Sequence, residues 1–206
     1  NRWLIEHGYL VVKDGGAAAH SNGSLEDVDW AHSQAYAVGL NSIYLNLQGR
    51  EGQGSVAVSE LEPLLHKLRD ELLAWTGPDG RPVLQRVLLK HEAFSGALTP
   101  YGPDLVLGYS PGYRASSETG LGKWESELVV KNHDHWGADH CIDSQAVPGV
   151  IFSNLGLHGL ENPSYLDIPL LVLGKELKQT NKPAPPPGAA GGEDKAVLEE
   201  RLKSLG

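Results

Sequence analysis

The sequence predicts an α/β protein in which a mostly parallel sheet is covered by helices. Two observations lead to this prediction: strand and helix signals alternate in the first half of the chain, and several strands are continuously apolar. Strands buried on both faces of a parallel sheet have such apolar runs, and helices connect them. With 206 residues, the chain is long enough to bury one sizeable core.

The first expected elements are the end of a helix, a strand and a loop. Residues 1–8 have the pattern of the last turns of a helix, and an apolar strand is expected at 9–12. Residues 14–24 are rich in Gly, Ala, Ser and Asn, which is typical of a surface loop. Because the chain opens within a helical pattern and contains no methionine, we expect a longer segment to precede Asn1.

The strongest helix signal spans residues 59–75 and follows a strand expected at 42–47. Ser59 and Glu62 have the spacing of a capping box. The apolar stripe of this helix consists of Leu61, Leu64, Leu65, Leu68 and Leu72. A Gly-Pro-Asp-Gly turn at 77–80 ends it.

The second half of the chain contains three further strands and a change of composition. The strands are expected at 83–89, 104–109 and 149–153, and a helix is expected at about 164–177. We therefore assign residues 1–180 to one domain. Residues 181–193, almost all Pro, Ala and Gly, form the predicted linker, and residues 194–206 form the predicted amphipathic tail helix.

Bulk properties exclude some classes of function. The formal net charge of -9 argues against a protein that binds nucleic-acid polymers, since such proteins present a basic face. No apolar run approaches the roughly 18 residues of a membrane span. The single cysteine, Cys141, excludes an internal disulfide, and a buried thiol is a better interpretation than a nucleophile.

Metal-ligand residue types are concentrated in residues 132–143. This stretch contains three histidines, three aspartates and the cysteine, and imidazole and carboxylate groups are ligands of hydrolytic zinc or manganese sites. The competing interpretation is a solvated surface loop, which we favour for His133 and His135. For Asp139 and His140 we favour a role in the site, because the strand expected next suggests a loop at a sheet edge.

Four segments, taken together and in order, resemble the type I phosphodiesterase/nucleotide pyrophosphatase family of the alkaline phosphatase superfamily. The most specific is Gly137-Ala138-Asp139-His140-Cys141-Ile142-Asp143, continuing from Val147 to Asn154, which is similar to the last metal-binding loop of that family. The other three lie within residues 29–51, 103–114 and 167–169. The similarity covers about residues 1–175. Ala138 departs from the glycine that is usual in the family.

The resemblance implies the C-terminal part of an alkaline-phosphatase-like α/β/α sandwich that hydrolyses a small phosphate ester or nucleotide. The family uses two divalent metal ions, usually zinc, and a threonine or serine nucleophile, whose segment is expected before Asn1. The isolated chain is then expected to be inactive. His140 is the one metal ligand that the resemblance places in this chain, and Asp139 and Asp143 are expected to shape the loop and orient the imidazole.

Other interpretations remain open at this point. A sulfatase or a phosphomutase would share the superfamily fold, and the nucleophile would distinguish them. A non-catalytic α/β module could instead bind a partner through residues 194–206. Within the chain, Arg114 could contact a phosphate, and Tyr113 and Trp124 could stack on a base, although structural roles are at least as plausible for these three residues.

Overall fold

The computed structural model describes residues 1–13, 21–133, 135, 142–147, 149–154, 165 and 167–174. The chain divides into two compact units, residues 1–148 and residues 149–206, and each is described by itself.

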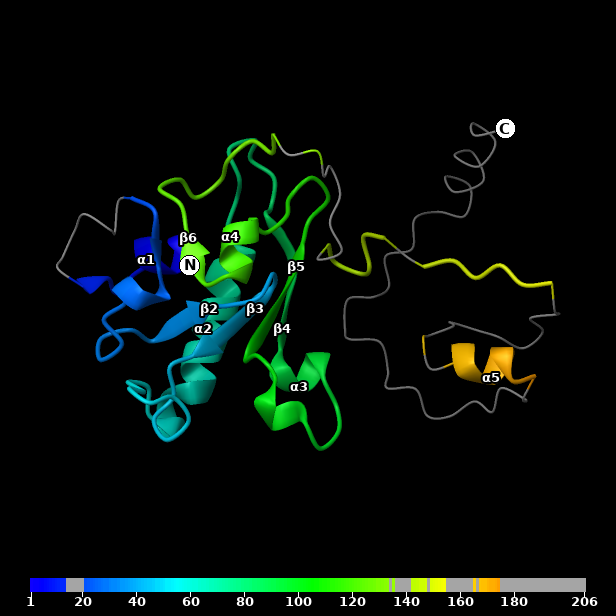
Figure 1. Cartoon of the computed structure of the whole chain (residues 1–206), viewed down its shortest axis with the longest axis horizontal. Helices are drawn as coiled ribbons and strands as arrows, with labels where there is room; N and C mark the ends of the chain where they lie inside the picture. Colours follow the sequence, from blue (N-terminus) through cyan, green and yellow to red (C-terminus); the bar gives the residue numbers. More distant parts are fainter. Residues whose placement is uncertain are drawn as a thin grey trace. The chain divides into compact units, whose positions relative to one another are not determined.

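The first unit is built on a four-stranded antiparallel sheet (Figure 1). Its spatial order is β2 (Ala35–Ala37), β3 (Ser42–Leu45), β5 (Leu105–Tyr109) and β4 (Leu84–Leu89). A second antiparallel sheet pairs β1 (Gly23–Ser24) with β6 (Lys123–Trp124). The mixed α/β class is therefore confirmed, whereas the prediction of a mostly parallel sheet is wrong for the residues that the structure describes.

The direction of the strands explains this error. β3 and β4 are both antiparallel to β5, so they run in the same direction, and α2 (Leu61–Leu73) connects them. This is a split β-α-β arrangement in which β5 is inserted between the two parallel strands. The alternation of strand and helix signals thus agrees with the β3-α2-β4 connection, but β5 lies between the two strands and pairs with each of them in the antiparallel direction, and β2 pairs with β3 in the antiparallel direction as well.

Short helices surround the sheet. Those in the first unit are α1 (Arg2–Glu6), η2 (Leu25–Asp27), η3 (Val58–Glu60), α2, α3 (Lys90–Ala93), η4 (Thr99–Tyr101) and α4 (Ser117–Gly120). The long helix expected at 59–75 is confirmed as η3 and α2, and four of its leucines are buried. The expected capping box of Ser59 and Glu62 is not formed. Instead, the Ala57 N–H donates to Glu60 Oε2 at 3.0 Å.

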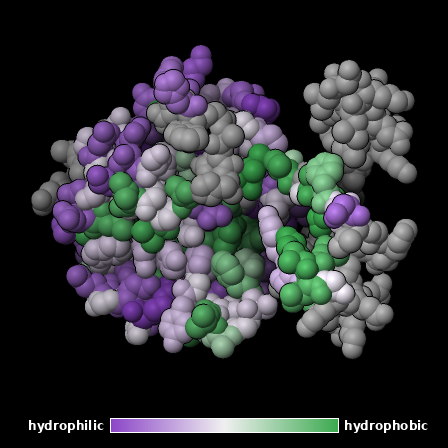
Figure 2. Space-filling view, turned by 45° about the vertical axis from the view of Figure 1, so that its right-hand side comes forward, coloured by the Kyte–Doolittle hydropathy of each residue, from purple (hydrophilic) through white to green (hydrophobic). Residues whose placement is uncertain are grey.

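The core of this unit is formed by α1, α2 and the sheet. Leu4, Leu68 and Leu105 are almost completely inaccessible to solvent and come from these three parts. The helix end expected near His7 is confirmed, because this ring stacks on Trp3 at 3.9 Å and its Nδ1 bonds to the Trp3 carbonyl at 2.8 Å. On the face shown in Figure 2, apolar side chains reach the surface at several separate places among hydrophilic ones.

In the second unit, the structure describes one helix, α5 (Ile168–Val172). It lies within the helix expected at 164–177. The strand expected at 149–153 is wrong, because these residues have no regular structure and Phe152 is 92% exposed. The predicted linker (181–193) and tail helix (194–206) lie outside the described residues. Within the described part of the chain, no helix is both long and apolar enough to cross a membrane.

Candidate functional site

A buried carboxylate at the start of β5 connects three parts of the first unit. Asp104, 3% exposed, accepts two hydrogen bonds from the Arg50 guanidinium, at 3.0 and 2.7 Å. Lys90 Nζ lies 2.8 Å from Asp104 Oδ1, and the Leu45 N–H donates to Oδ2 at 2.8 Å. Both carboxylate oxygens are therefore occupied, which suits a structural role and leaves no site for proton transfer.

The electrostatics of this centre follow from its contacts. Burial raises the pKa of the Asp104 carboxyl, but hydrogen bonds from Arg50, Lys90 and the Leu45 N–H outweigh it, so the pKa lies below its ordinary value. Glu51 extends the network, since its Oε1 accepts from Arg50 Nε at 2.7 Å and its Oε2 from the Leu47 N–H at 2.8 Å. The network therefore fixes Arg50 and Glu51 against β3.

A second buried ion pair lies at the other end of β5. Asp143 is 3% exposed, and its Oδ2 accepts from Arg86 Nε at 2.6 Å. The Asp143 N–H donates to the Tyr109 carbonyl at 3.1 Å, and Ile142 forms an isolated parallel bridge with Tyr109. Asp143 Oδ1 accepts from the Gln145 N–H at 2.8 Å. Residues 142–147 are thus attached to the sheet through Asp143.

A pocket in the first unit has a volume of about 990 Å³. Tyr113, Arg114 and Trp124 all line it, and so does His133. The sequence had suggested the first three as contacts for a phosphate or a base, and the structure brings them to one pocket. The lining also mixes basic and acidic side chains, so its charge alone selects no ligand.

One rim of this pocket is fixed by a short hydrogen-bonded cluster. Asp79 accepts from Tyr113 Oη and, at 2.7 Å, from Arg81 Nε, and the Arg81 guanidinium lies 5.8 Å from the Tyr113 ring centroid. The hydrogen bond from Tyr113, followed by those from the Arg81 backbone and side chain, lowers the pKa of Asp79 to about 2. Asp79 therefore stays ionised at neutral pH and joins the 77–81 turn to the 111–114 turn.

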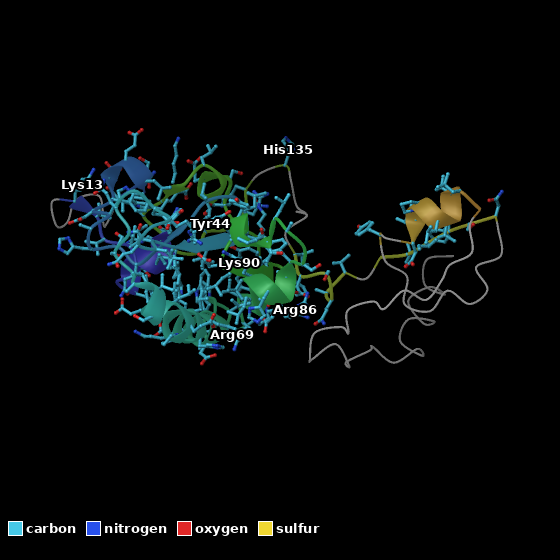
Figure 3. All side chains as sticks on the ribbon, turned by 90° about the horizontal axis from the view of Figure 1, so that it is seen from below. Lys13, Tyr44, Arg69, Arg86, Lys90 and His135 are labelled. Carbon is cyan, nitrogen blue, oxygen red and sulfur yellow. The ribbon has the colours of Figure 1, made fainter. Side chains whose placement is uncertain are left out.

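The structure describes only some of the residues of the predicted metal site. His140, Asp139 and Cys141 lie outside them. His133 and His135 are exposed, and His135 points away from the sheet (Figure 3). No group of three His, Cys, Asp or Glu side chains within the described residues could hold a metal ion. These residues alone therefore do not form the two-metal centre that the resemblance implies.

For Asp143, the geometry agrees with the expected loop-shaping role, since both of its oxygens are used within the protein. Sequence reasoning missed its partner, Arg86, and the residue beneath it, Gly108. Each had a signal: Arg86 is the one charged residue of an apolar strand, and Gly108 interrupts another. A glycine inside a strand often marks a close approach of another group.

No family model, no curated protein and no solved structure matches this chain in comparisons with known proteins.

Proposed function

We propose that this chain is the C-terminal part of a metal-dependent phosphoester hydrolase similar to the type I phosphodiesterases/nucleotide pyrophosphatases. Its substrate would be a small phosphate ester or a nucleotide. For the complete domain we propose the α/β/α sandwich of the alkaline phosphatase superfamily. The observation that supports this proposal is that three segments resembling the family meet along β5.

One of these junctions is a buried ion pair and the other is a backbone hydrogen bond. Arg50, in the first of the three segments, binds Asp104 at the start of β5, in the second. At the other end of the strand, Tyr109 bonds to Asp143, in the third. A fold shared with the family would require these segments to contact one another, so the contacts support the proposal.

His140 is the proposed metal ligand in this chain. It precedes Ile142, which is fixed beside the carboxyl end of β5, by two residues. Ile142 is the described residue nearest to the proposed ligand in the sequence. In this proposal the metal ions, when bound, neutralise charge that develops on the phosphoryl group and activate the nucleophile. The nucleophile and the remaining ligands are proposed to precede Asn1.

The decisive test replaces His140 in a polypeptide that includes the segment preceding Asn1. We expect His140→Ala to lower the zinc content, measured by mass spectrometry, and to reduce hydrolysis of bis(4-nitrophenyl) phosphate by roughly 100-fold or more, since losing a first ligand should exceed the usual 10- to 100-fold cost of losing a supporting group. His135→Ala is the matched control and should change neither quantity, because His135 is exposed and points away from the sheet (Figure 3).

Three outcomes would contradict the proposal or part of it. Full zinc content and activity in the His140→Ala variant would overturn the ligand assignment. A parent protein that binds no zinc and cleaves no phosphodiester would overturn the hydrolase itself and favour the non-catalytic module. Zinc binding with cleavage of a sulfate ester, but not of a phosphodiester, would favour the sulfatase alternative.

A further inference from the structure

We infer that Asp143, Arg86 and Gly108 form a latch that positions residues 142–147 on the sheet. The docking of this segment involves only residues that the structure describes. A role in catalysis rests on the proposed function, in which Arg86 and Asp143 are positioning residues for the loop that ends at this segment.

The latch spans three neighbouring stretches of chain. Gly108 on β5 is the cross-strand partner of Arg86 on β4, and the 142–143 backbone pairs with Tyr109 on β5. The Asp143 carboxylate therefore crosses over β5 at Gly108 to reach Arg86 Nε at 2.6 Å. Arg86 Nη2 also donates to Ser144 Oγ at 3.1 Å. One guanidinium thus holds two consecutive residues of the segment (Figure 3 labels Arg86).

Gly108 makes this crossing possible. A Cβ atom at position 108 would lie well inside van der Waals contact with the Asp143 side chain, closest to its Oδ2 and also to its Cγ and Cβ atoms. Any other residue would therefore push the carboxylate off the strand and lengthen its contact with Arg86. A glycine in the middle of a strand weakens the strand, so its presence here is explained by the close approach of another group.

Burial of the Asp143–Arg86 ion pair costs desolvation free energy. Only 2% of the Asp143 side chain and 21% of the Arg86 side chain are exposed. Buried pairs contribute little net stability, but losing one partner leaves the other charge without compensation. Their best-attested use is to specify one register, and here the register is that of Ile142 beside Tyr109.

The experiment measures hydrogen–deuterium exchange of the 206-residue chain. We expect Arg86→Gln, Asp143→Asn and Gly108→Ala each to accelerate exchange of the amides of Asp143 and Ala146 by tenfold or more relative to amides of α2. Both reporter amides donate within the latch: the Asp143 N–H donates to the Tyr109 carbonyl, and the Ala146 N–H donates to the Asp143 carbonyl.

Three further variants complete the test and separate the latch from general destabilisation. The double variant Arg86→Gln/Asp143→Asn removes both charges and so leaves no buried charge without a partner. The amides of residues 143 and 146 should therefore exchange more slowly in it than in either single variant. Arg69→Ala is the matched control: it breaks a 3.4 Å ion pair with Glu92 that does not involve residues 142–147, and should leave their exchange unchanged. If a single variant fails to fold, Ser144→Ala provides the mild test, because it removes only the bond to Arg86 Nη2.

If amide exchange in residues 142–147 accelerates by the same factor as amide exchange in α2 in every variant, the latch is overturned. Hydrolysis by the polypeptide that includes the preceding segment then tests the positioning role: we expect the latch variants to lower kcat by roughly 10- to 100-fold, with rescue in the double variant. Unchanged kcat would overturn that role. If the parent itself is inactive, the proposed function fails and the positioning role with it, while the exchange result still decides the latch.

Discussion

The buried Asp104 carboxylate joins three parts of the first unit through its polar contacts. It accepts from Arg50, Lys90 and the Leu45 N–H, so its carboxylate links the 45–51 stretch, β5 and α3. We expect Asp104→Asn to lower the free energy of unfolding at pH 7 by roughly 2 to 4 kcal/mol, because charged hydrogen bonds are lost and Arg50 and Lys90 lose the buried carboxylate that they share. Urea denaturation measures this difference.

The same contacts predict how that difference changes with pH. Although burial raises the pKa of Asp104, the stronger effect of its three donors holds the folded-state pKa below the ordinary value. A carboxyl with a depressed folded-state pKa stabilises the protein above its unfolded pKa of about 4, and this contribution is lost as the pH falls through the folded value. Wild type and Asp104→Asn should therefore converge below about pH 4. A constant difference from pH 7 to pH 3 would contradict this account.

At the scale of residues, the sequence identifies charged residues but not the residues with which they pair in the fold. Arg50 and Asp104 both lie in segments quoted for the family resemblance, yet nothing in their 54-residue separation indicates that they pair. Asp143 was expected to shape its loop and orient the imidazole of His140, and Arg86 was not foreseen as its partner. Pairing depends on strand order, which local patterns do not encode.

At the scale of elements, the turn between β3 and η3 offers a sharp test of backbone packing. A Cβ atom on Gly54 would collide with the backbone of Leu47 and Gln48, whereas one on Gly52 would meet no atom within 4 Å. Backbone cannot move aside as a flexible side chain can, so we expect Gly54→Ala to cost about 1 to 3 kcal/mol. Gly52→Ala should be close to neutral. Equal effects of the two substitutions on the urea midpoint would refute the packing argument.

The expected elements were found where one face of the sequence is clearly apolar. α2, β3, β4 and β5 all lie within their predicted ranges. Strand direction was wrong because apolar residues such as Val106 and Tyr44 occupy the half-buried face of the sheet and make alternating burial resemble a continuous run. The 149–153 strand failed for the complementary reason: an apolar run forms a strand only where a sheet edge is there to pair with it.

At the scale of the whole molecule, the core and the latch belong to the same unit. Every buried apolar residue described lies between Trp3 and Trp124, and the latch lies within residues 1–148. The sheet ends in β2 and β4, and the second ion pair attaches residues 142–147 beside β5. This organisation predicts that the two parts of the chain beyond Lys131 contribute differently to stability.

Truncation should reveal that difference. We expect residues 1–148 to unfold cooperatively within a few degrees of the full chain, because the core and both ion pairs are retained. Residues 1–131 should unfold roughly 5 to 10 °C lower, since Arg86 loses Asp143 and Tyr109 loses its bridge to Ile142. Circular dichroism melting compares the three chains. A large loss in residues 1–148 would mean that residues 149–206 complete the core, and equal midpoints for both truncations would mean that the latch adds nothing to the stability of the sheet.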